Sequence, residues 1–567
     1  MYKKVSFICL LVLSLIPLGG LAHSGLPVTH DGQDHVARIA NFYQNLQEGN
    51  GIPRWAPNLN WGYGHPILMF LYPLPSYTTS AIHFLGFSFV DSVKIFFALA
   101  FILSGLVMYI WLKEFLFKGG AFIGAMLYVF APYRFIDLYV RGAIGEHAAF
   151  IFPPLVLYFL FKLSKKQSYL YILGGALSLA GLILAHNAIS LMFIPVIILY
   201  ATFLIWNSKK RKVLILNSLF LILFGFILSA FFWMPALMEG KYTLRDIVTQ
   251  GSVNDRFVSF QQLLDGPWSY GGTGQFSVQV GLLHWFFIVV SIPLLFMLKK
   301  KRDRNWILLF ASLLLFFFTL FLMTPYSQLL WEKVTTLQKF QFPWRFLSLS
   351  VFLSAVIGAI VIHESSGHKA LKSSSQRLGI LVLLIVAILF LNKDYWHAKD
   401  YLQKPESFYT GIYDSTTDTG ESAPIWSVRF MEKRPSAHLE IIDGRAKIAE
   451  KERTSTLRRY SIDAASNVKL KENTLYFPGW KVLVDGKEVA VEFQNQNHRG
   501  LMTFFVDKGK HDVTTKFEET KLRLIADSIS AVGLFLLVFF GILNLTSLRG
   551  GTTKQSTTRS PRPSGSR

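Results

Sequence analysis

The sequence predicts an all-α polytopic membrane bundle of about twelve transmembrane helices, with a C-terminal extracytoplasmic β-sandwich domain inserted before the last helix. Composition is the first reason, because 52% of the 567 residues are hydrophobic and 15% are aromatic. The second reason is that apolar runs of about 17–24 residues recur along the chain, and each can cross about 30 Å of hydrocarbon. The third is that basic residues gather in short connectors between these runs.

The apolar runs give the predicted spans in order. They lie near residues 5–21, 93–111, 120–138, 147–163, 169–185, 188–206, 213–236, 279–298, 306–323, 346–363, 378–392 and 524–545. Segment 66–87 is also apolar, but it contains three prolines. If it crossed the membrane, the loop with Asp31 would lie on the side opposite to the one that Lys3 and Lys4 dictate. We therefore expect 66–87 to be an interfacial helix.

The basic connectors, such as Lys209 to Lys212, follow the positive-inside rule. The formal net charge of +22 therefore sets orientation, with both termini in the cytoplasm, and predicts no nucleic acid partner. The first run is either a retained span or a signal peptide cleaved near Ala22, and its length favours the span. The single cysteine, Cys9, excludes a disulfide within the chain and a cysteine-based metal site.

The chain divides into parts of different composition. We expect a transmembrane module over 1–392 with an acidic first outer loop at 22–92, an extracytoplasmic β-rich domain over 393–523, a last transmembrane helix at 524–546, and a disordered basic cytoplasmic tail at 547–567. Alternating residues around Asp485-Gly486 predict a hairpin with a tight turn in the β-rich domain.

The first outer loop carries an acidic cluster made of His30, Asp31, Asp34, His35 and Arg38. On a helix, spacings of three and four residues bring these side chains onto shared faces. Two carboxylates beside histidines suit general-base catalysis, and Asp31, Asp34 and His35 are candidate ligands for a divalent metal such as Mg²⁺ or Mn²⁺. The alternative is a polar, capped helix at the membrane surface without a catalytic role.

Other polar groups are expected on the same outer face. Arg134, Arg141 and Arg345 lie there against the prevailing charge bias, close to Glu146 and to the pair His186-Asn187. A guanidinium at headgroup depth can grip a phosphate through two hydrogen bonds. The alternative for each arginine is contact with ordinary lipid headgroups.

These motifs resemble a known family. The segments that carry the likeness are His30-Asp31, Pro53-Arg54-Trp55, Gly62 to Pro66, Tyr72 to Pro75, Pro132-Tyr133-Arg134, Tyr139 to Ala143, His186-Asn187 and Phe342 to Phe346. Together they resemble the bacterial membrane family described as 6-pyruvoyl-tetrahydropterin synthase-related, within the GT-C-like superfamily of polytopic membrane glycosyltransferases. The hairpin at 476–489 is similar to the outer domain of YfhO-type membrane proteins.

The resemblance implies a multi-pass protein of the bacterial cytoplasmic (inner) membrane. It also implies inverting transfer of a sugar from a polyprenyl-phosphate donor to an extracytoplasmic glycan, lipid or protein acceptor. The catalytic residues would be Asp31, Asp34 and Glu146, and the substrate-binding residues would be His35, Arg38, Arg134, Arg141, His186, Asn187 and Arg345. Which of Asp31 and Asp34 is the base stays open, because Asp34 departs from the family's usual residue.

The zinc site of the soluble pterin synthase has three histidines, and the sequence offers no matching cluster. Two other functions remain open. One is a lipid-linked glycan flippase or exporter, which would need a polar path through the bundle. The other is a non-catalytic cell-envelope assembly protein, for which the acidic cluster would be dispensable.

Overall fold

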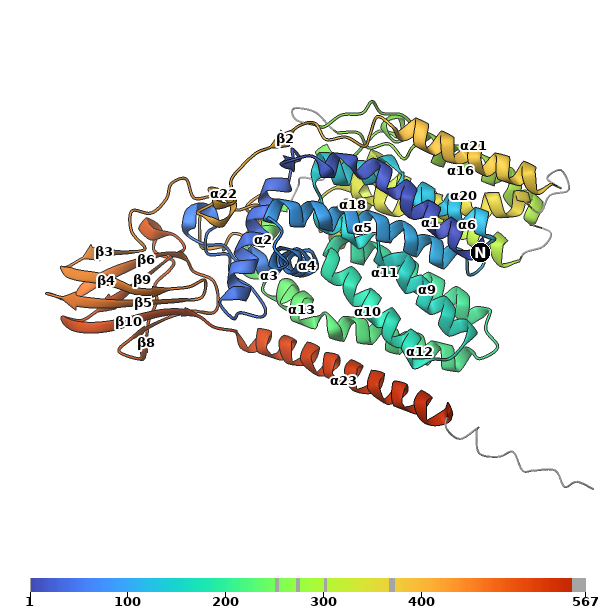
Figure 1. Cartoon of the computed structure of the whole chain (residues 1–567). Coiled ribbons are helices and arrows are strands. Elements are labelled where there is room, and N and C mark those ends of the chain that lie inside the picture. Colours follow the sequence, from blue (N-terminus) through green and yellow to red (C-terminus); the bar gives the residue numbers. More distant parts are fainter. Residues whose placement is uncertain (1, 250–253, 272–275, 300–302, 367–372, 553–567) are drawn as a thin grey trace, which may run out of the picture.

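The computed structural model describes residues 2–249, 254–271, 276–299, 303–366 and 373–552. Most of these residues are helical, and strands form one β domain near the C-terminal end. The predicted fold class of a helical membrane protein with a β domain is therefore confirmed. Figure 1 shows the long helices gathered in one bundle, the strands at one end of it, and α23 running along its side. From residue 553 onward, the predicted tail lies outside the described residues.

Each of the predicted spans coincides with a helix or a pair of helices. Within the described ranges, nine helical stretches are long and apolar enough to cross a membrane, or ten if one bent pair counts as a span, and two shorter apolar helices accompany them. The helices are α1 (Tyr2–Leu15), α5 (Phe89–Leu112), α6 (Lys118–Val129), α9 (Phe152–Lys165), α10 (Tyr169–Ala185), α11 (Asn187–Trp206), α12 (Arg211–Leu228), α16 (Leu282–Leu298), α17 (Arg304–Met323), α20 (Leu347–Ser366), α21 (Ser374–Asn392) and α23 (Lys521–Thr552).

Short helices fill the segments between the spans. They are α2 (Gly32–Gln47), α3 (Ile67–Phe70), α4 (Pro73–Phe84), α7 (Pro132–Phe135), α8 (Ile144–Ala149), α13 (Ala230–Met238), α14 (Arg245–Thr249), α15 (Phe260–Leu264), α18 (Gln328–Lys333), α19 (Thr335–Gln338) and α22 (Glu406–Thr410). The apolar segment 66–87 forms α3 and α4, and neither is among the helices long enough to cross. Figure 1 shows α2, α3 and α4 at the end of the bundle nearest the strands. The interfacial placement of 66–87 stays a prediction.

A break after α6 shapes the region that later forms the site. Ala131 is extended, as a residue before proline prefers, and Pro132 begins α7 after a 45° bend. The chain then widens into the π-helical turn η3 (Ile136–Arg141). This turn ends at Gly142, whose φ of 66° is a left-handed conformation that glycine adopts without strain. The bend and the wide turn together bring Arg141 beside Glu146.

The β domain is a sandwich of two antiparallel sheets. Their strand orders are β4-β5-β10-β7-β8 and β3-β6-β9. Residues on β5 alternate between buried and more exposed, so one face of each sheet covers a core that includes Ile462, Leu470 and Val513. The strands are β3 (Leu439–Asp443), β4 (Ala446–Arg453), β5 (Leu457–Ala464), β6 (Val468–Leu475), β7 (Trp480–Val484), β8 (Lys487–Val489), β9 (Leu501–Val506) and β10 (Gly509–Phe517).

The predicted Asp485-Gly486 turn joins β7 and β8. Both residues have positive φ, at 48° and 79°, as a tight hairpin turn requires. The segment 393–438, which precedes the sandwich, is largely irregular. Within the described chain this segment has one strand, the two-residue β2 (Tyr401–Leu402). It pairs with β1 (Leu26–Pro27) instead of joining the sandwich.

Polar contacts hold the first loop against the sandwich and against the start of α23. Arg54 is nearly buried and forms ion pairs with Glu519 at 2.9 Å and with Asp527 on α23 at 2.6 Å. The backbone N–H of Leu475 donates to the carbonyl of Tyr63 at 3.1 Å. The first loop, the segment 393–438 and the sandwich therefore lie at the same end of the bundle.

Candidate functional site

The backbone of Asp31 is held by hydrogen bonds, but its carboxylate has no partner among the described residues. The backbone N–H groups of His30 and Asp31 donate to the carbonyls of Val140 and Arg141, each at 2.9 Å. Asp31 is the N-cap of α2, where an aspartate normally accepts a backbone N–H and stabilises the helix by about 1 kcal/mol. Here its side chain makes no such bond. Within the described ranges its carboxylate also has no ion pair or other hydrogen bond, so both oxygens are available to a ligand.

The next turn of α2 is occupied by partners from a distant segment. The Tyr413 hydroxyl donates to Asp34 at 3.0 Å, and Arg38 donates to His35 Nδ1 at 3.1 Å and to the carbonyl of Thr417. Burial raises the pKa of Asp34, although Arg38 and Tyr413 act in the opposite direction. Burial, and then Arg38, hold the pKa of His35 well below its usual value. The two carboxylates therefore differ in environment, with Asp31 free and Asp34 engaged.

A buried ion network lies where η3, α8 and η7 (Pro343–Phe346) meet. Arg141 Nη1 is 2.7 Å from Asp137 and 2.8 Å from Glu146. The Tyr133 hydroxyl donates to Glu146 at 2.6 Å, and Arg345 Nε lies 3.6 Å from the same carboxylate. Because donors already surround both of its oxygens, Glu146 acts as a counter-ion that positions two arginines.

Tyr72, from the first outer loop, packs against His186. Its ring stacks on the imidazole of His186, with centroids 4.7 Å apart. Burial raises the pKa of its hydroxyl to about 12. The charged groups close enough to act on that hydroxyl are Arg38, Asp31, Arg345 and Arg141. The three arginines lower this pKa and Asp31 raises it, so all four charges act on the Tyr72 hydroxyl.

The remaining predicted site residues on the outer face differ in the contacts that they make. His186 is buried at the N-terminus of α11, and burial together with Arg345 lowers its pKa to about 3, so its imidazole is neutral. Asn187 follows it and bonds to the backbone N–H of Ala188 at 3.2 Å. Arg134 is fully buried, donates to the Ser104 hydroxyl at 3.1 Å and lies 4.0 Å from the ring centroid of Phe150. The structure thus brings Arg141, Arg345 and His186 together and leaves Arg134 committed to packing.

Asp31, Asp34 and His35 are not grouped as ligands of one metal ion in the described chain. His35 presents Nδ1 to the Arg38 guanidinium, while its Nε2 is buried without a hydrogen-bond partner. Asp34 is hydrogen-bonded to Tyr413. In the part of the chain that the structure describes, no group of three or more His, Cys, Asp or Glu side chains is arranged for a metal ion.

Sequence reasoning missed several residues at this site. Tyr413 and Asp418 come from segment 393–438, and Asp418 lies 3.7 Å from the buried imidazole of His65. No local pattern links these residues to a loop far away in sequence. Arg256 is different, because it lies 4.4 Å from the Phe342 ring centroid, next to Arg345, and donates to the Gln341 carbonyl at 3.1 Å. The charge bias that singled out Arg345 would also have selected it.

Comparison with known proteins gives one family match. The model described as "6-pyruvoyl-tetrahydropterin synthase related domain; membrane protein" matches residues 68–401. An uncharacterised protein of Lactococcus lactis subsp. cremoris is 26% identical over 327 residues, which cover 55% of this chain and 53% of that protein. The chain therefore spans about half the length of this curated relative.

Two solved structures are similar at low identity. A crystal structure of the Archaeoglobus fulgidus oligosaccharyltransferase in complex with zinc and sulfate has a TM-score of 0.43 at 13% identity, covering 75% of this chain and 59% of that one. ArnT from Cupriavidus metallidurans bound to undecaprenyl phosphate has a TM-score of 0.36 at 11% identity, covering 72% and 68%. The family match includes Arg141, His186 and Arg345 but begins after Asp31.

Proposed function

The chain belongs to the 6-pyruvoyl-tetrahydropterin synthase-related family of membrane proteins, and we propose that it is a membrane glycosyltransferase. It moves a sugar from a polyprenyl-phosphate donor to an acceptor hydroxyl with inversion at the anomeric carbon. The observation that carries this proposal is the unpartnered carboxylate of Asp31, whose charge acts on the Tyr72 hydroxyl together with those of Arg38, Arg141 and Arg345.

Asp31 is the general base. Its backbone is fixed by hydrogen bonds, and its carboxylate is only partly buried. Asp34 is less suited to this role because its oxygen already accepts from Tyr413 and burial favours its neutral form. A correctly placed base contributes about 10²–10⁴-fold to a rate, so the helix-capping bond that Asp31 forgoes is small by comparison.

In this proposal, Arg141 and Arg345 bind the phosphate of the donor. Arg141 and Arg345 share the counter-ion Glu146, which fixes their guanidinium groups before a substrate arrives. Donors that are held in place need no reorganisation when charge develops on a leaving group. Arg256 supports this role, because it adds a guanidinium beside the same Phe342 ring.

The bond changes follow from these roles. Asp31 accepts the proton of the acceptor hydroxyl, and the hydroxyl oxygen attacks the anomeric carbon of the donor. The bond between that carbon and the phosphate oxygen breaks, and polyprenyl phosphate leaves with the electron pair. The guanidinium groups stabilise the new phosphate charge, and Asp31 later returns its proton to water. No metal is needed to balance this step.

The test measures polyprenyl phosphate released by the purified full chain in lipid nanodiscs, with a panel of polyprenyl-phosphate sugars as donors. We expect Asp31→Asn to lower the rate by about 10²–10⁴-fold while the thermal unfolding temperature stays unchanged. The matched control is Asp246→Asn, an exposed carboxylate on α14 outside the site, and it should retain the wild-type rate. Full activity of a folded Asp31→Asn protein would disprove the assignment of the base.

A further inference from the structure

A cavity opens between helices of the bundle, and Asp31 is not among the residues that line it. It has a volume of about 260 Å³ and lies between the C-terminal ends of α6 and α21 and the N-terminal end of α16. These helix ends lead into the segments that carry the candidate site. Exposed leucines line the rim, with Leu264 40%, Leu282 65% and Leu391 38% accessible. In a chain that spans a membrane, such a rim faces lipid.

The polar side chains that line this largely apolar cavity offer mainly hydrogen-bond acceptors. Asn392 donates to the carbonyl of Ile388 at 2.8 Å, which leaves its side-chain oxygen unpaired within the described ranges. Gln279 likewise uses only its amide N–H groups, one of them toward the Tyr395 hydroxyl at 3.2 Å. His284 bonds through Nε2 to the Leu127 carbonyl at 3.0 Å. The residues Gln279, His284 and Asn392 are all more than nine-tenths buried.

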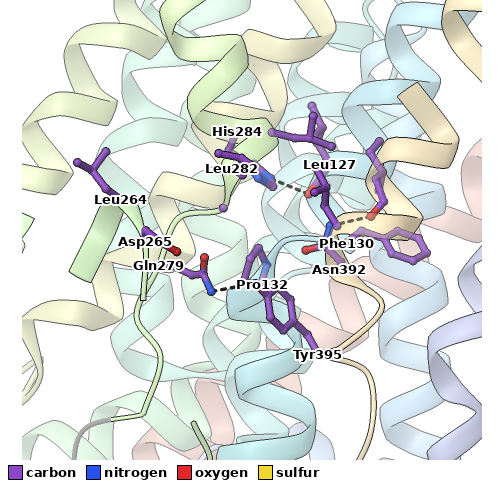
Figure 2. Close-up of a pocket in the computed structure, with 14 residues that line it drawn as sticks. Leu127, Phe130, Pro132, Leu264, Asp265, Gln279, Leu282, His284, Asn392 and Tyr395 are labelled. Carbon is purple, nitrogen blue, oxygen red and sulfur yellow. Dashed lines mark hydrogen bonds between the residues drawn. The ribbon is translucent and has the colours of Figure 1, made fainter. Parts of the chain in front are cut away.

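Figure 2 shows how these groups surround the hollow. Asp265 and Gln279 lie on one side, Asn392 on the other, and Tyr395 closes the base. Like the amide oxygens, the Asp265 carboxylate forms no ion pair or hydrogen bond with any described residue. The Tyr395 hydroxyl accepts from Gln279 and retains its proton for donation.

The polar groups of the cavity indicate which class of ligand it can bind. The unpaired oxygens of Asp265, Gln279 and Asn392 line the cavity and stay accessible to solvent, so the favoured occupant is one whose donors replace those of water. A phosphodiester group supplies none, and no lysine or arginine lines the cavity to neutralise its charge. A sugar headgroup supplies several hydroxyl donors and accepts from Tyr395. The exposed leucines at the rim call for an apolar chain attached to that headgroup.

We propose that this cavity binds a neutral glycolipid, with the sugar hydroxyls on Asp265, Gln279 and Asn392 and the chain against α16 and α21. Helix α21 fits this picture, because only 6% of its most apolar stretch is buried within the protein. A lipid chain would cover part of the remaining surface. Binding at this cavity goes beyond the proposed transfer reaction and does not depend on it.

The cavity is connected to the acidic loop by aromatic side chains. Tyr395 stacks on Trp268 with ring centroids 4.7 Å apart, and the ring centroids of Trp268 and Tyr270 are 5.9 Å apart. The Tyr270 carbonyl lies 2.8 Å from His30 Nε2, next to Asp31. A lipid bound in the cavity would therefore be linked through these side chains to the segment that positions the proposed base.

The experiment measures lipid binding to the full chain by native mass spectrometry. The probe is monoglucosyl-diacylglycerol, and the competitors are diacylglycerol, which lacks the sugar, and phosphatidylglycerol, which has an anionic phosphate. We expect the glucosyl lipid to bind at least about tenfold more tightly than either competitor. The loss of one or two hydrogen bonds should make Asn392→Leu and Tyr395→Phe bind it about five- to tenfold more weakly.

The control variant is Asn207→Leu. Asn207 donates to the carbonyl of Phe203, four residues earlier, at 2.8 Å, as Asn392 does to Ile388, but it is exposed at the other end of the bundle. It should leave binding unchanged. If Asn392→Leu does not fold, Tyr395→Phe decides, because its ring can still stack on Trp268. Equal binding of the glucosyl lipid by wild type and Tyr395→Phe, or tighter binding of phosphatidylglycerol, would overturn the proposal.

Discussion

Replacing Glu146 by glutamine should destabilise the protein strongly. The Glu146 carboxylate is fully buried and accepts from Tyr133 at 2.6 Å and Ser348 at 2.7 Å. A glutamine oxygen can still accept these neutral donors. Its amide cannot neutralise Arg141 or Arg345, which lie 2.8 Å and 3.6 Å from the native carboxylate. Removing one partner of a buried ion pair costs about 3–5 kcal/mol, and we expect the lower end because Asp137 remains beside Arg141.

The assay is unfolding in mixed micelles, and the chain supplies a matched control. Glu472 in the β-sandwich is also fully buried, accepts from the Tyr460 hydroxyl at 2.8 Å and lies near Arg453 and Arg458 at 3.4 Å and 3.6 Å. Glu472→Gln should destabilise the sandwich without affecting transfer by the folded protein. Glu146→Gln should lower both stability and transfer. A loss below about 1 kcal/mol for Glu146→Gln would refute the role of this carboxylate as the shared counter-ion.

Three further changes test other parts of the structure. Burial raises the pKa of Asp34 in the folded protein, so ionisation of this carboxyl opposes folding. Wild type should therefore lose stability as the pH rises from the unfolded pKa of about 3.9 through the higher folded pKa. Asp34→Asn should therefore be more stable than wild type at pH 7 but not at pH 3, and equal stability profiles would contradict this. Arg54→Ala leaves Asp527 without this partner and Glu519 with only the more distant Arg523, at 3.9 Å, and should lower the free energy of unfolding by about 3 kcal/mol; a neutral effect would show that the first loop is held against α23 by other contacts. Gly486→Ala, at a φ of 79°, should cost about 1 kcal/mol in thermal unfolding, and an unchanged melting temperature would argue against a strained turn.

The helical framework could be predicted because span length and charge placement are local properties of the sequence. Each apolar run became a helix, and the Asp485-Gly486 pair became a turn with positive φ. Positions within the runs were harder to predict. Arg134 and Arg141 are close in sequence, but the π-helical turn between them turns Arg141 into the ion network and leaves Arg134 in the packed interior. Regular helical periodicity does not anticipate this change of direction.

Long-range contacts account for the rest of what the sequence did not reveal. Tyr413 reaches Asp34 across 379 residues, and Thr417 accepts from Arg38 over the same separation. These partners explain why Asp31, and not Asp34, keeps a free carboxylate. Their segment, 393–438, precedes a β-rich domain and is itself irregular, so no periodic pattern predicted where it would lie.

The most direct test of the account is chemical rescue of the missing base. Asp31→Ala removes the carboxylate but leaves the backbone bond to Arg141 and the arginine network intact. We predict that sugar transfer from the polyprenyl-phosphate donor falls by about 10²–10⁴-fold and is partly restored by sodium formate, a small carboxylate that can occupy the space. Transfer at the wild-type rate by folded Asp31→Ala protein without formate would contradict the account.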